Sequence, residues 1–411
     1  MSKQNGTVQT DTKRAANQAV VPNVRFPRQY GSELLVLREG KGCRVTDSKG
    51  KRYLDFGAGI AVNALGYGRD DLAEAAAAQM RKLIHVSNLY ATEPALELAE
   101  KLTASGPFEA VHFGNSGSEA NEAAIKYARM YAYRTRGEGH YKLMAFSGGF
   151  HGRTLGALSC TFSPKYQDPF RPMVPGCVES PYNDAEALER GLDGSFAAVI
   201  VEVVQGEGGL TCMTREFAHA LNTLCRKHGC LLIADEVQTG LARTGSLYAH
   251  EQVGLEPDIV TLAKPLAGGL PLSATLVPER VNRELHQAEH GTTFGGGPVV
   301  TAVALKIWEI LSDPDFIRDV AARGARLAEL LAGLKRDFPQ AGAVKGLGLL
   351  RGLELPEESL PDVMAAAREA GLLVLRSGAD VLRIAPPLII SPEELAQGVE
   401  ILAGALKAVL G

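Results

Sequence analysis

Short apolar runs alternate with helical patterns along the middle of the chain. Five such runs, each followed by polar or glycine-rich sequence, predict β-strands at Ala110–Phe113, Leu143–Phe146, Ala197–Val201, Cys230–Ala234 and Ile259–Leu262. The segments between them, for example EAAIKYARMYAYR, repeat apolar residues at the spacing of an α-helix. Strands that alternate with helices predict an α/β fold with a mostly parallel sheet flanked by helices.

The two ends of the chain show other patterns. Between Leu34 and Asp55, the turn sequences REGKG and DSKGK separate short alternating stretches, which predicts an antiparallel meander. The chain closes with a helix for which Ser391 and Glu394 form a capping box. We therefore expect a disordered tail at 1–22, an N-terminal segment packed on the small domain at 23–75, a large domain at 76–310 and a smaller C-terminal α+β domain at 311–411.

Composition and charge narrow the class of protein. The 411 residues are 45% hydrophobic and 22% charged, which is typical of a folded globular protein. The net charge of −4 gives no electrostatic reason to expect nucleic acid or a membrane surface as the partner. No long apolar run predicts a membrane span or a secretory signal, so we expect a cytoplasmic protein that acts on small molecules. The six cysteines form no CxxC pair and are expected to be reduced core thiols.

Glycine is in excess, at 45 of 411 residues. Many of the glycines lie in turns that follow the predicted strands. Such turns are either loose loops or places where the backbone approaches a ligand closely. Neither GxGxxG nor GxxxxGK[ST] occurs, so these turns do not indicate the common nucleotide-binding motifs.

Three reactive side chains come just after consecutive predicted strands. Glu202 follows the strand at 197–201, Asp235 follows the strand at 230–234, and Lys264 lies two residues after the strand at 259–262. Connections of about thirty residues leave room for helical crossovers, so the three groups are expected at one edge of the sheet. An acid and a lysine at such an edge are either a structural ion pair or parts of a functional site.

A fourth strand leads through the turn Ser116, Gly117 and Ser118 directly into a helix. The free N–H groups at the start of a helix favour an anion, although an ordinary capping box of Ser116 and Glu119 is the alternative. An anion site, a carboxylate and an amine together match what pyridoxal phosphate requires of a protein.

A different candidate site is His286-Gln-Ala-Glu289-His290, which fits the HxxEH pattern of one class of zinc peptidases. Zinc ligands need rigid support, whereas this segment runs directly into HGTTFGGG. A solvated helix end is therefore the favoured interpretation, and we expect no metal. A zinc hydrolase stays as a distant alternative.

Seven motifs resemble those of the class III, fold-type I, pyridoxal-phosphate-dependent aminotransferases, in the same order from about residue 30 onward. They are NSGSEANEAAIK, FHGRT, VVQGEGG, IADEVQTGLARTG, TLAKPLAGGLP, HGTTFGGGP and LRIAPPL. The resemblance implies pyridoxal 5'-phosphate as cofactor and a homodimer with shared active sites. The sequences of these motifs are most similar to those of members that move the δ-amino group of N2-acetyl-L-ornithine to 2-oxoglutarate in arginine biosynthesis.

The resemblance also implies roles for individual residues at the cofactor. Lys264 would be the Schiff-base lysine and the group that moves the proton, and Asp235 would keep the pyridine nitrogen protonated. Thr293 matches a residue that the family supplies from the neighbouring subunit. The implied cofactor-binding residues are Ser116, Gly117, Ser118, Phe150, Asp235, Gln238, Lys264 and Thr293. With the cofactor there, the glycine turns would pack against it and be well ordered.

For the substrates, the resemblance implies two arginine clamps. Arg153 would bind the single carboxylate of acetylornithine or the side-chain carboxylate of glutamate. Arg383 would bind the α-carboxylate of glutamate and would be neutralised by Glu207 while acetylornithine is bound. Tyr30 matches a tyrosine that contacts the substrate.

Departures from the family pattern leave the substrate open. Val203 stands where the family usually has a proline after the glutamate, Gly297 replaces the asparagine of GGNP, and LGYGRDD replaces a stretch of the LGH type. Other ω-amino acid transaminases, acting on ornithine, succinylornithine, 4-aminobutyrate or a carrier-linked lysine precursor, are therefore alternatives. Arg153 counts against a glutamate-1-semialdehyde aminomutase, and the intact Lys264 and Asp235 count against a binding scaffold without activity.

Overall fold

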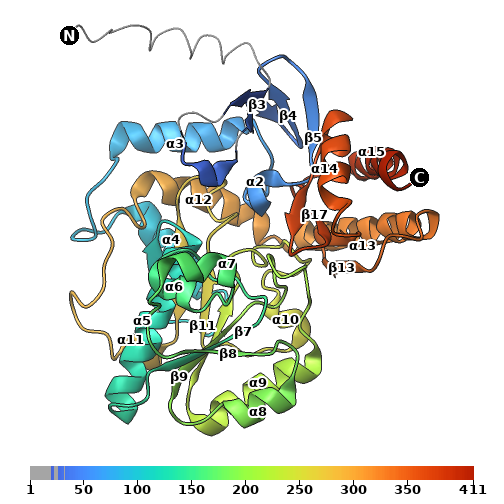
Figure 1. Cartoon of the computed structure of the whole chain (residues 1–411). Helices are drawn as coiled ribbons and strands as arrows, with labels where there is room; N and C mark the ends of the chain where they lie inside the picture. The colour runs from blue at the N-terminus through green and yellow to red at the C-terminus, as the bar shows by residue number, and fades with distance from the viewer. Residues whose placement is uncertain (1–19, 23–25, 32) are drawn as a thin grey trace, which may run out of the picture.

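The computed structural model describes residues 20–22, 26–31 and 33–411. Its central sheet has seven strands in the order β6-β12-β11-β10-β9-β7-β8 (Figure 1). The bounds of these strands are β6 Ala110–Gly114, β7 Lys142–Phe146, β8 Cys177–Ser180, β9 Phe196–Val201, β10 Leu231–Asp235, β11 Ile259–Leu262 and β12 Ser273–Val277.

All five predicted strands are present, and each boundary lies within one residue of the prediction. Strands β11, β10, β9, β7 and β8 are parallel, whereas β12 runs antiparallel to both β11 and β6. Because β12 is antiparallel to both of its neighbours, β6 points in the same direction as the parallel strands. The carboxyl ends of β6, β9, β10 and β11 therefore meet at one edge of the sheet.

Two separate apolar cores lie on the two faces of this sheet. In β9, Val199 and Val201 belong to one core, whereas Ala198 and Ile200 belong to the other. This division follows from the alternation of side chains along a strand. Helix α5, Gly117–Arg136, covers one face with buried alanines, whose small side chains let its backbone lie close to the sheet.

The region before residue 312 contains further helices besides α5. Their bounds are α2 Ala58–Ala61, α3 Asp70–Lys82, α4 Glu93–Thr103, α6 Leu155–Ser159, α7 Pro164–Gln167, α8 Ala185–Gly191, α9 Arg215–His228, α10 His250–Val253, α11 Glu279–Asn282 and α12 Pro298–Leu311, with 3-10 turns η1 at Arg28–Tyr30 and η2 at Asp168–Phe170. No helix in the described part of the chain is long and apolar enough to cross a membrane.

The C-terminal part forms a smaller α+β unit beside the large domain (Figure 1). Its antiparallel sheet has the order β13-β14-β17-β16. The bounds are β13 Val344–Leu347, β14 Leu350–Glu354, β16 Leu375–Ser377 and β17 Val381–Ile384, with helices α13 Pro314–Asp337, α14 Leu360–Glu369 and α15 Pro392–Leu410. The predicted capping box of Ser391 and Glu394 is formed at the start of α15.

The N-terminal and C-terminal parts of the chain share a second sheet. Strands β3 Leu37–Lys41, β4 Arg44–Asp47 and β5 Arg52–Asp55 form the predicted antiparallel meander. Strand β15, Leu372–Leu373, adds to β5 in parallel. The predicted tail at 1–22 lies outside the described residues up to residue 19, but Val20–Pro22 form β1, which pairs with β2, Glu33–Leu35.

All six cysteines are free thiols, and four of them are buried. The sulfur atoms of Cys160 and Cys177 lie 3.5 Å apart, at hydrogen-bond distance.

Candidate active site

The structure brings Glu202, Asp235 and Lys264 to one edge of the central sheet, as the sequence predicts. Glu202 directly follows β9, Asp235 ends β10, and Lys264 comes two residues after β11. These three strands are neighbours and run in parallel, so their ends lie side by side. This is the edge at which open α/β sheets bind their ligands.

Asp235 is almost fully buried, with 4% of its surface exposed, and it accepts three hydrogen bonds. Its Oδ2 atom accepts from Asn121 Nδ2 at 2.8 Å and from His151 Nδ1 at 2.7 Å. Its Oδ1 atom accepts from the backbone N–H of Val237 at 3.1 Å. Among the described residues, Asp235 and Lys264 form no ion pair, so the structure does not support the simple ion-pair interpretation.

His151 and Asn121 hold Asp235 but were not among the predicted site residues. Burial alone would lower the pKa of His151, but the hydrogen bond and the negative charge of Asp235 outweigh it and raise that pKa. Asn121 also donates to the backbone oxygen of His151 at 2.7 Å and accepts from Thr261 Oγ1 at 2.8 Å. A buried carboxylate surrounded by fixed donors is oriented for one further partner.

Glu202 ties two glycine-containing turns together behind the site. Its carboxylate accepts the backbone N–H of Phe150 at 2.8 Å and that of Gly206 at 3.0 Å. Burial raises the pKa of Glu202 to about 7, with His151 lowering it and Asp235 adding to the rise. Glu202 therefore positions the turn that carries Phe150.

The amine of Lys264 has no hydrogen-bond or ion-pair partner within residues 20–22, 26–31 and 33–411. Burial, together with the positive charge of Arg383, lowers its pKa to about 8. A lysine with a lowered pKa carries a larger share of neutral, nucleophilic amine near neutral pH. Lys264 is therefore chemically suited to attack a carbonyl group.

The turn before α5 leads directly into the helix, but the expected capping box of Ser116 and Glu119 is incomplete. Ser116 Oγ accepts the backbone N–H of Glu119 at 3.3 Å, so it caps the helix. Glu119 does not return this bond to Ser116; its carboxylate accepts the backbone and side-chain N–H groups of Asn115 at 2.8 and 2.7 Å instead. The capping box is thus only half formed, because the Asn115 side chain competes for the carboxylate.

Arg383 comes from β17 of the small domain and reaches the large-domain site. Its Nη1 atom donates to Glu207 Oε1 at 2.6 Å, to the backbone oxygen of Gly206 at 2.9 Å and to Gln238 Oε1 at 3.3 Å. Arg383 is 3% exposed, and its Nε atom has no partner in the described structure. Glu207 therefore neutralises a buried guanidinium that keeps unused donor capacity.

Arg153, in contrast, is exposed, and its guanidinium lies against two aromatic rings. Its Cζ atom is 5.3 Å from the centre of the Phe150 ring and 3.8 Å from that of Tyr166. Its backbone N–H donates to Ser118 Oγ at 3.1 Å. The turn that carries Arg153 is thereby joined to the predicted phosphate turn. Tyr166 was not predicted from the sequence.

Two predicted residues lie apart from this group. Tyr30 is 60% exposed on η1, and its ring meets that of Phe26. Thr293 lines a cavity of about 270 Å³ between the 85–99 segment and the 293–298 loop. Within the described chain, no hydrogen bond or ring contact joins either residue to Lys264, Asp235 or Arg153.

The zinc interpretation of His286–His290 is not supported. Glu289 forms an ion pair with Arg134, and Arg134 also contacts His286. His290 contacts Lys126 Nζ at 2.7 Å instead of facing His286. Ala288 has a positive φ of 68°, so the segment is a turn rather than a helix. No group of three His, Cys, Asp or Glu side chains that could hold a metal occurs among the residues described.

The glycine turns pack mainly against other parts of the chain. A Cβ atom on Gly152 would lie 2.4 Å from Ser118 Oγ, and one on Gly206 would lie 2.2 Å from Gln238 Nε2. A Cβ atom on Gly295 would lie 2.2 Å from the backbone oxygen of Phe113. The glycines therefore let the turns pack closely on one another around the site. The expectation that these turns also pack against the cofactor stays a prediction.

Comparisons with known proteins identify the family. The model of the class-III aminotransferases matches residues 26–406. A probable mitochondrial acetylornithine aminotransferase of Dictyostelium discoideum is 46% identical over 370 residues, which is 88% of this chain and 82% of that protein. A succinylornithine transaminase of Salmonella typhimurium is 44% identical over 364 residues, 88% of this chain and 89% of that protein.

Among solved structures, the N-acetylornithine aminotransferase of Stenotrophomonas maltophilia K279a superposes with a TM-score of 0.81 at 35% identity, covering 93% of this chain and 98% of that one. The chain belongs to the class-III aminotransferases. It is a pyridoxal-phosphate-dependent enzyme with the fold-type I architecture of that family.

The residues present fit this cofactor. The unpartnered amine of Lys264, the oriented carboxylate of Asp235 and the start of the 20-residue helix α5 supply an amine, an anion and a set of free N–H groups. These are the groups that an aldehyde, a pyridinium nitrogen and a phosphate require.

Proposed function

We propose that this enzyme transfers the δ-amino group of N2-acetyl-L-ornithine to 2-oxoglutarate. The observation that carries the proposal is the difference between the two arginines. Arg383 is neutralised by Glu207 at 2.6 Å, whereas the guanidinium of Arg153 is exposed and has no acidic partner in the described chain. A donor with a single carboxylate fits a site that offers one free guanidinium. An acceptor with two carboxylates requires Glu207 to release Arg383.

The chain's own residues prepare the site for this transfer. Lys264 would hold the aldehyde carbon of the cofactor and, once displaced by the substrate amine, would carry the proton between the two carbons that exchange it. Asp235, held by His151 and Asn121, would keep the ring nitrogen protonated. Pyridoxal phosphate, when bound, supplies a ring that stabilises negative charge on the substrate carbon.

Other residues would orient the cofactor without taking part in proton transfer. Phe150 would lie against its ring, because Glu202 fixes the turn from which Phe150 projects. Gln238 would face the phenolic oxygen with its amide. Ser116, Gly117 and Ser118 would hold the phosphate at the start of α5, where the helix dipole favours negative charge.

Succinylornithine is the second candidate donor, because the Salmonella typhimurium relative of that name is 44% identical. Both donors present the same δ-amine and α-carboxylate, and they differ in the acyl group, which in succinylornithine carries a second carboxylate. The lack of a counter-charge beside Arg153 does not distinguish them. Steady-state kcat/KM values, measured side by side for N-acetylornithine, succinylornithine, ornithine and 4-aminobutyrate, separate these activities. The expected cytoplasmic location stays a prediction.

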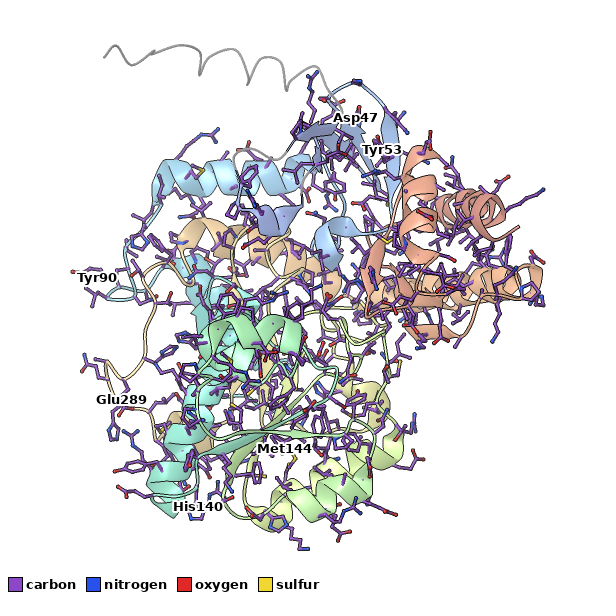
Figure 2. All side chains as sticks on the ribbon, in the orientation of Figure 1. Asp47, Tyr53, Tyr90, His140, Met144 and Glu289 are labelled. Carbon is purple, nitrogen blue, oxygen red and sulfur yellow. The ribbon has the colours of Figure 1, made fainter. Side chains whose placement is uncertain are left out.

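We also propose a homodimer in which Thr293 serves the site of the partner subunit. Large apolar side chains are exposed around the Thr293 cavity, among them Tyr90 at 73% and Phe294 at 67%. Figure 2 shows Tyr90 projecting from the body of the protein, on the same side as Glu289 of the loop that leads to Thr293. An exposed apolar patch of this kind favours association between chains.

The absorbance of the purified holoenzyme tests the reaction. Addition of N-acetylornithine should bleach the band of the bound aldehyde cofactor, and subsequent 2-oxoglutarate should restore it. Lys264→Ala should remove turnover and the borohydride-stable attachment of the cofactor. A Lys264→Ala variant with full activity, or a spectrum unchanged by every donor, would refute the proposal.

A further inference from the structure

Tyr166 holds the guanidinium of Arg153 by stacking. The Cζ atom of Arg153 lies 3.8 Å from the centre of the Tyr166 ring, closer than the 5.3 Å to the Phe150 ring. Within the described residues, the Arg153 side chain makes no hydrogen bond and no ion pair. Contacts with aromatic rings are therefore what fixes its direction.

The ring of Tyr166 is itself held in place. Tyr166 lies on the short helix α7, and its neighbour Gln167 is buried and donates to the backbone oxygen of Leu158 at 3.0 Å. Leu158 belongs to α6, which begins two residues after Arg153. Figure 1 shows α6 and α7 next to each other. The rings of Tyr166 and Phe150 also meet edge to face, with centres 6.2 Å apart.

Stacking suits a guanidinium that has to bind a carboxylate. All five N–H donors of arginine point outward in the plane of the group, so a ring over one face leaves the donor edge free. Without such support, a long exposed side chain loses rotamer entropy when it binds, which weakens binding.

We propose that Tyr166 is a positioning residue that sets the affinity of Arg153 for the substrate carboxylate. The inference rests on the proposed function, because that function assigns Arg153 to the carboxylate. Tyr166 touches neither the amine of Lys264 nor the carboxylate of Asp235 in the contacts described. Its loss should therefore weaken substrate binding while leaving the chemical steps in place.

Steady-state kinetics of the holoenzyme test the proposal. Tyr166→Leu should raise KM for 2-oxoglutarate and for the amino donor about three- to thirty-fold, the range expected for one cation–π contact, with kcat within about twofold of the wild type. Tyr166→Phe keeps the ring and should stay within about twofold in KM. Phe170→Leu removes an exposed aromatic side chain of η2 in the same segment and serves as the matched control.

A double-mutant cycle separates positioning from a general structural effect. Tyr166→Leu should add nothing to KM once Arg153 is alanine, because the group that it orients is gone. The proposal is overturned if Tyr166→Leu leaves KM unchanged, if Tyr166→Phe is as harmful as Tyr166→Leu, or if the effect persists in the Arg153→Ala background. If N-acetylornithine is no donor, the proposed function fails, but the same cycle can be run with 2-oxoglutarate and whichever donor is active.

Discussion

The Nδ1 atom of His151 lies 2.7 Å from Oδ2 of Asp235, which joins the FHGRT turn to the end of β10. Both side chains are buried, so neither can replace this hydrogen bond with a hydrogen bond to water. The residue proposed to keep the ring nitrogen of the cofactor protonated is thus oriented by a histidine from the turn that also carries Phe150 and Arg153. With the roles proposed for Phe150 and Arg153, cofactor binding and substrate binding share this one turn.

We expect His151→Gln to weaken cofactor binding about 10- to 100-fold, because a hydrogen bond to a charged group contributes about 1.5–3 kcal/mol. Fluorescence titration of the apo-enzyme with pyridoxal phosphate measures the dissociation constant. His286→Gln changes an exposed histidine and is the control. An unchanged dissociation constant in His151→Gln would show that Asp235 does not depend on this contact.

Glu207→Gln should shift the preference of the site toward glutamate. The substitution keeps the shape of the side chain but removes the charge that neutralises Arg383 at 2.6 Å. We expect the ratio of kcat/KM for glutamate over that for N-acetylornithine to rise about tenfold, which corresponds to about 1.4 kcal/mol. Single-turnover half-reactions with each donor give the two values. If the ratio is unchanged, Glu207 does not control access to Arg383.

The reactivity of Lys264 should titrate near pH 8. Burial and Arg383 lower the pKa of this amine to about 8, so in the apo-enzyme the neutral form grows as the pH rises through that value. The rate of covalent attachment of pyridoxal phosphate should rise across the same range. Arg383→Met removes the second cause of the shift and should move the midpoint upward. A midpoint near that of an ordinary lysine in the unmodified apo-enzyme would contradict the prediction.

Mixing two inactive variants tests the shared site. If Thr293 serves the partner's site, a heterodimer of Lys264→Ala with Thr293→Glu contains one site with both native residues and should recover activity. The glutamate is chosen because its larger, negatively charged side chain should disturb binding of an anionic cofactor. A mixture of Lys264→Ala with Asp235→Ala, whose changes both affect a subunit's own site, should stay inactive. Activity that does not recover in the first mixture after unfolding and refolding together would count against the shared site.

Gly398 in α15 should tolerate no side chain. A Cβ atom there would lie 2.0 Å from the Phe56 ring, so Gly398→Ala forces a backbone shift and should cost about 1–3 kcal/mol of unfolding free energy. Gly404, in the same helix, has open space within 4 Å of the point that a Cβ atom would occupy, and Gly404→Ala should be neutral or stabilise by up to about 1 kcal/mol. Denaturant unfolding of both variants checks the pair. Equal stabilities would show that the Phe56 contact is not tight.

Buried apolar runs made five of the seven strands of the central sheet predictable, and crossover geometry then placed Glu202, Asp235 and Lys264 together. Strand β8, whose sequence is CVES, has only two apolar residues and was not predicted. Strand β12 was missed because Ser273 and Thr275 interrupt its apolar pattern, although both are buried and Thr275 Oγ1 donates to the backbone oxygen of Ala120. The role of His151 was missed for another reason. It depends on a contact across 84 residues of sequence, which no local pattern encodes.

Asn121 and Tyr166 illustrate the same limit. Asn121 lies 114 residues from Asp235 in the sequence, and no local pattern distinguishes it from other polar positions of a helix. Tyr166 comes two residues after Pro164 in a short polar segment without apolar periodicity. Their neighbours in space follow from how α5, α6 and α7 pack, so only the folded structure shows them.

The parallel pairing of β15 with β5 closes one sheet from residues more than 300 positions apart. During synthesis, β5 of the meander at 37–55 can gain β15 as its neighbour only after residues 372–373 leave the ribosome. The central sheet, complete by residue 277, has all its strands long before that. Arg383, which is proposed to complete the substrate site, therefore takes its place among the last parts of the molecule to assemble.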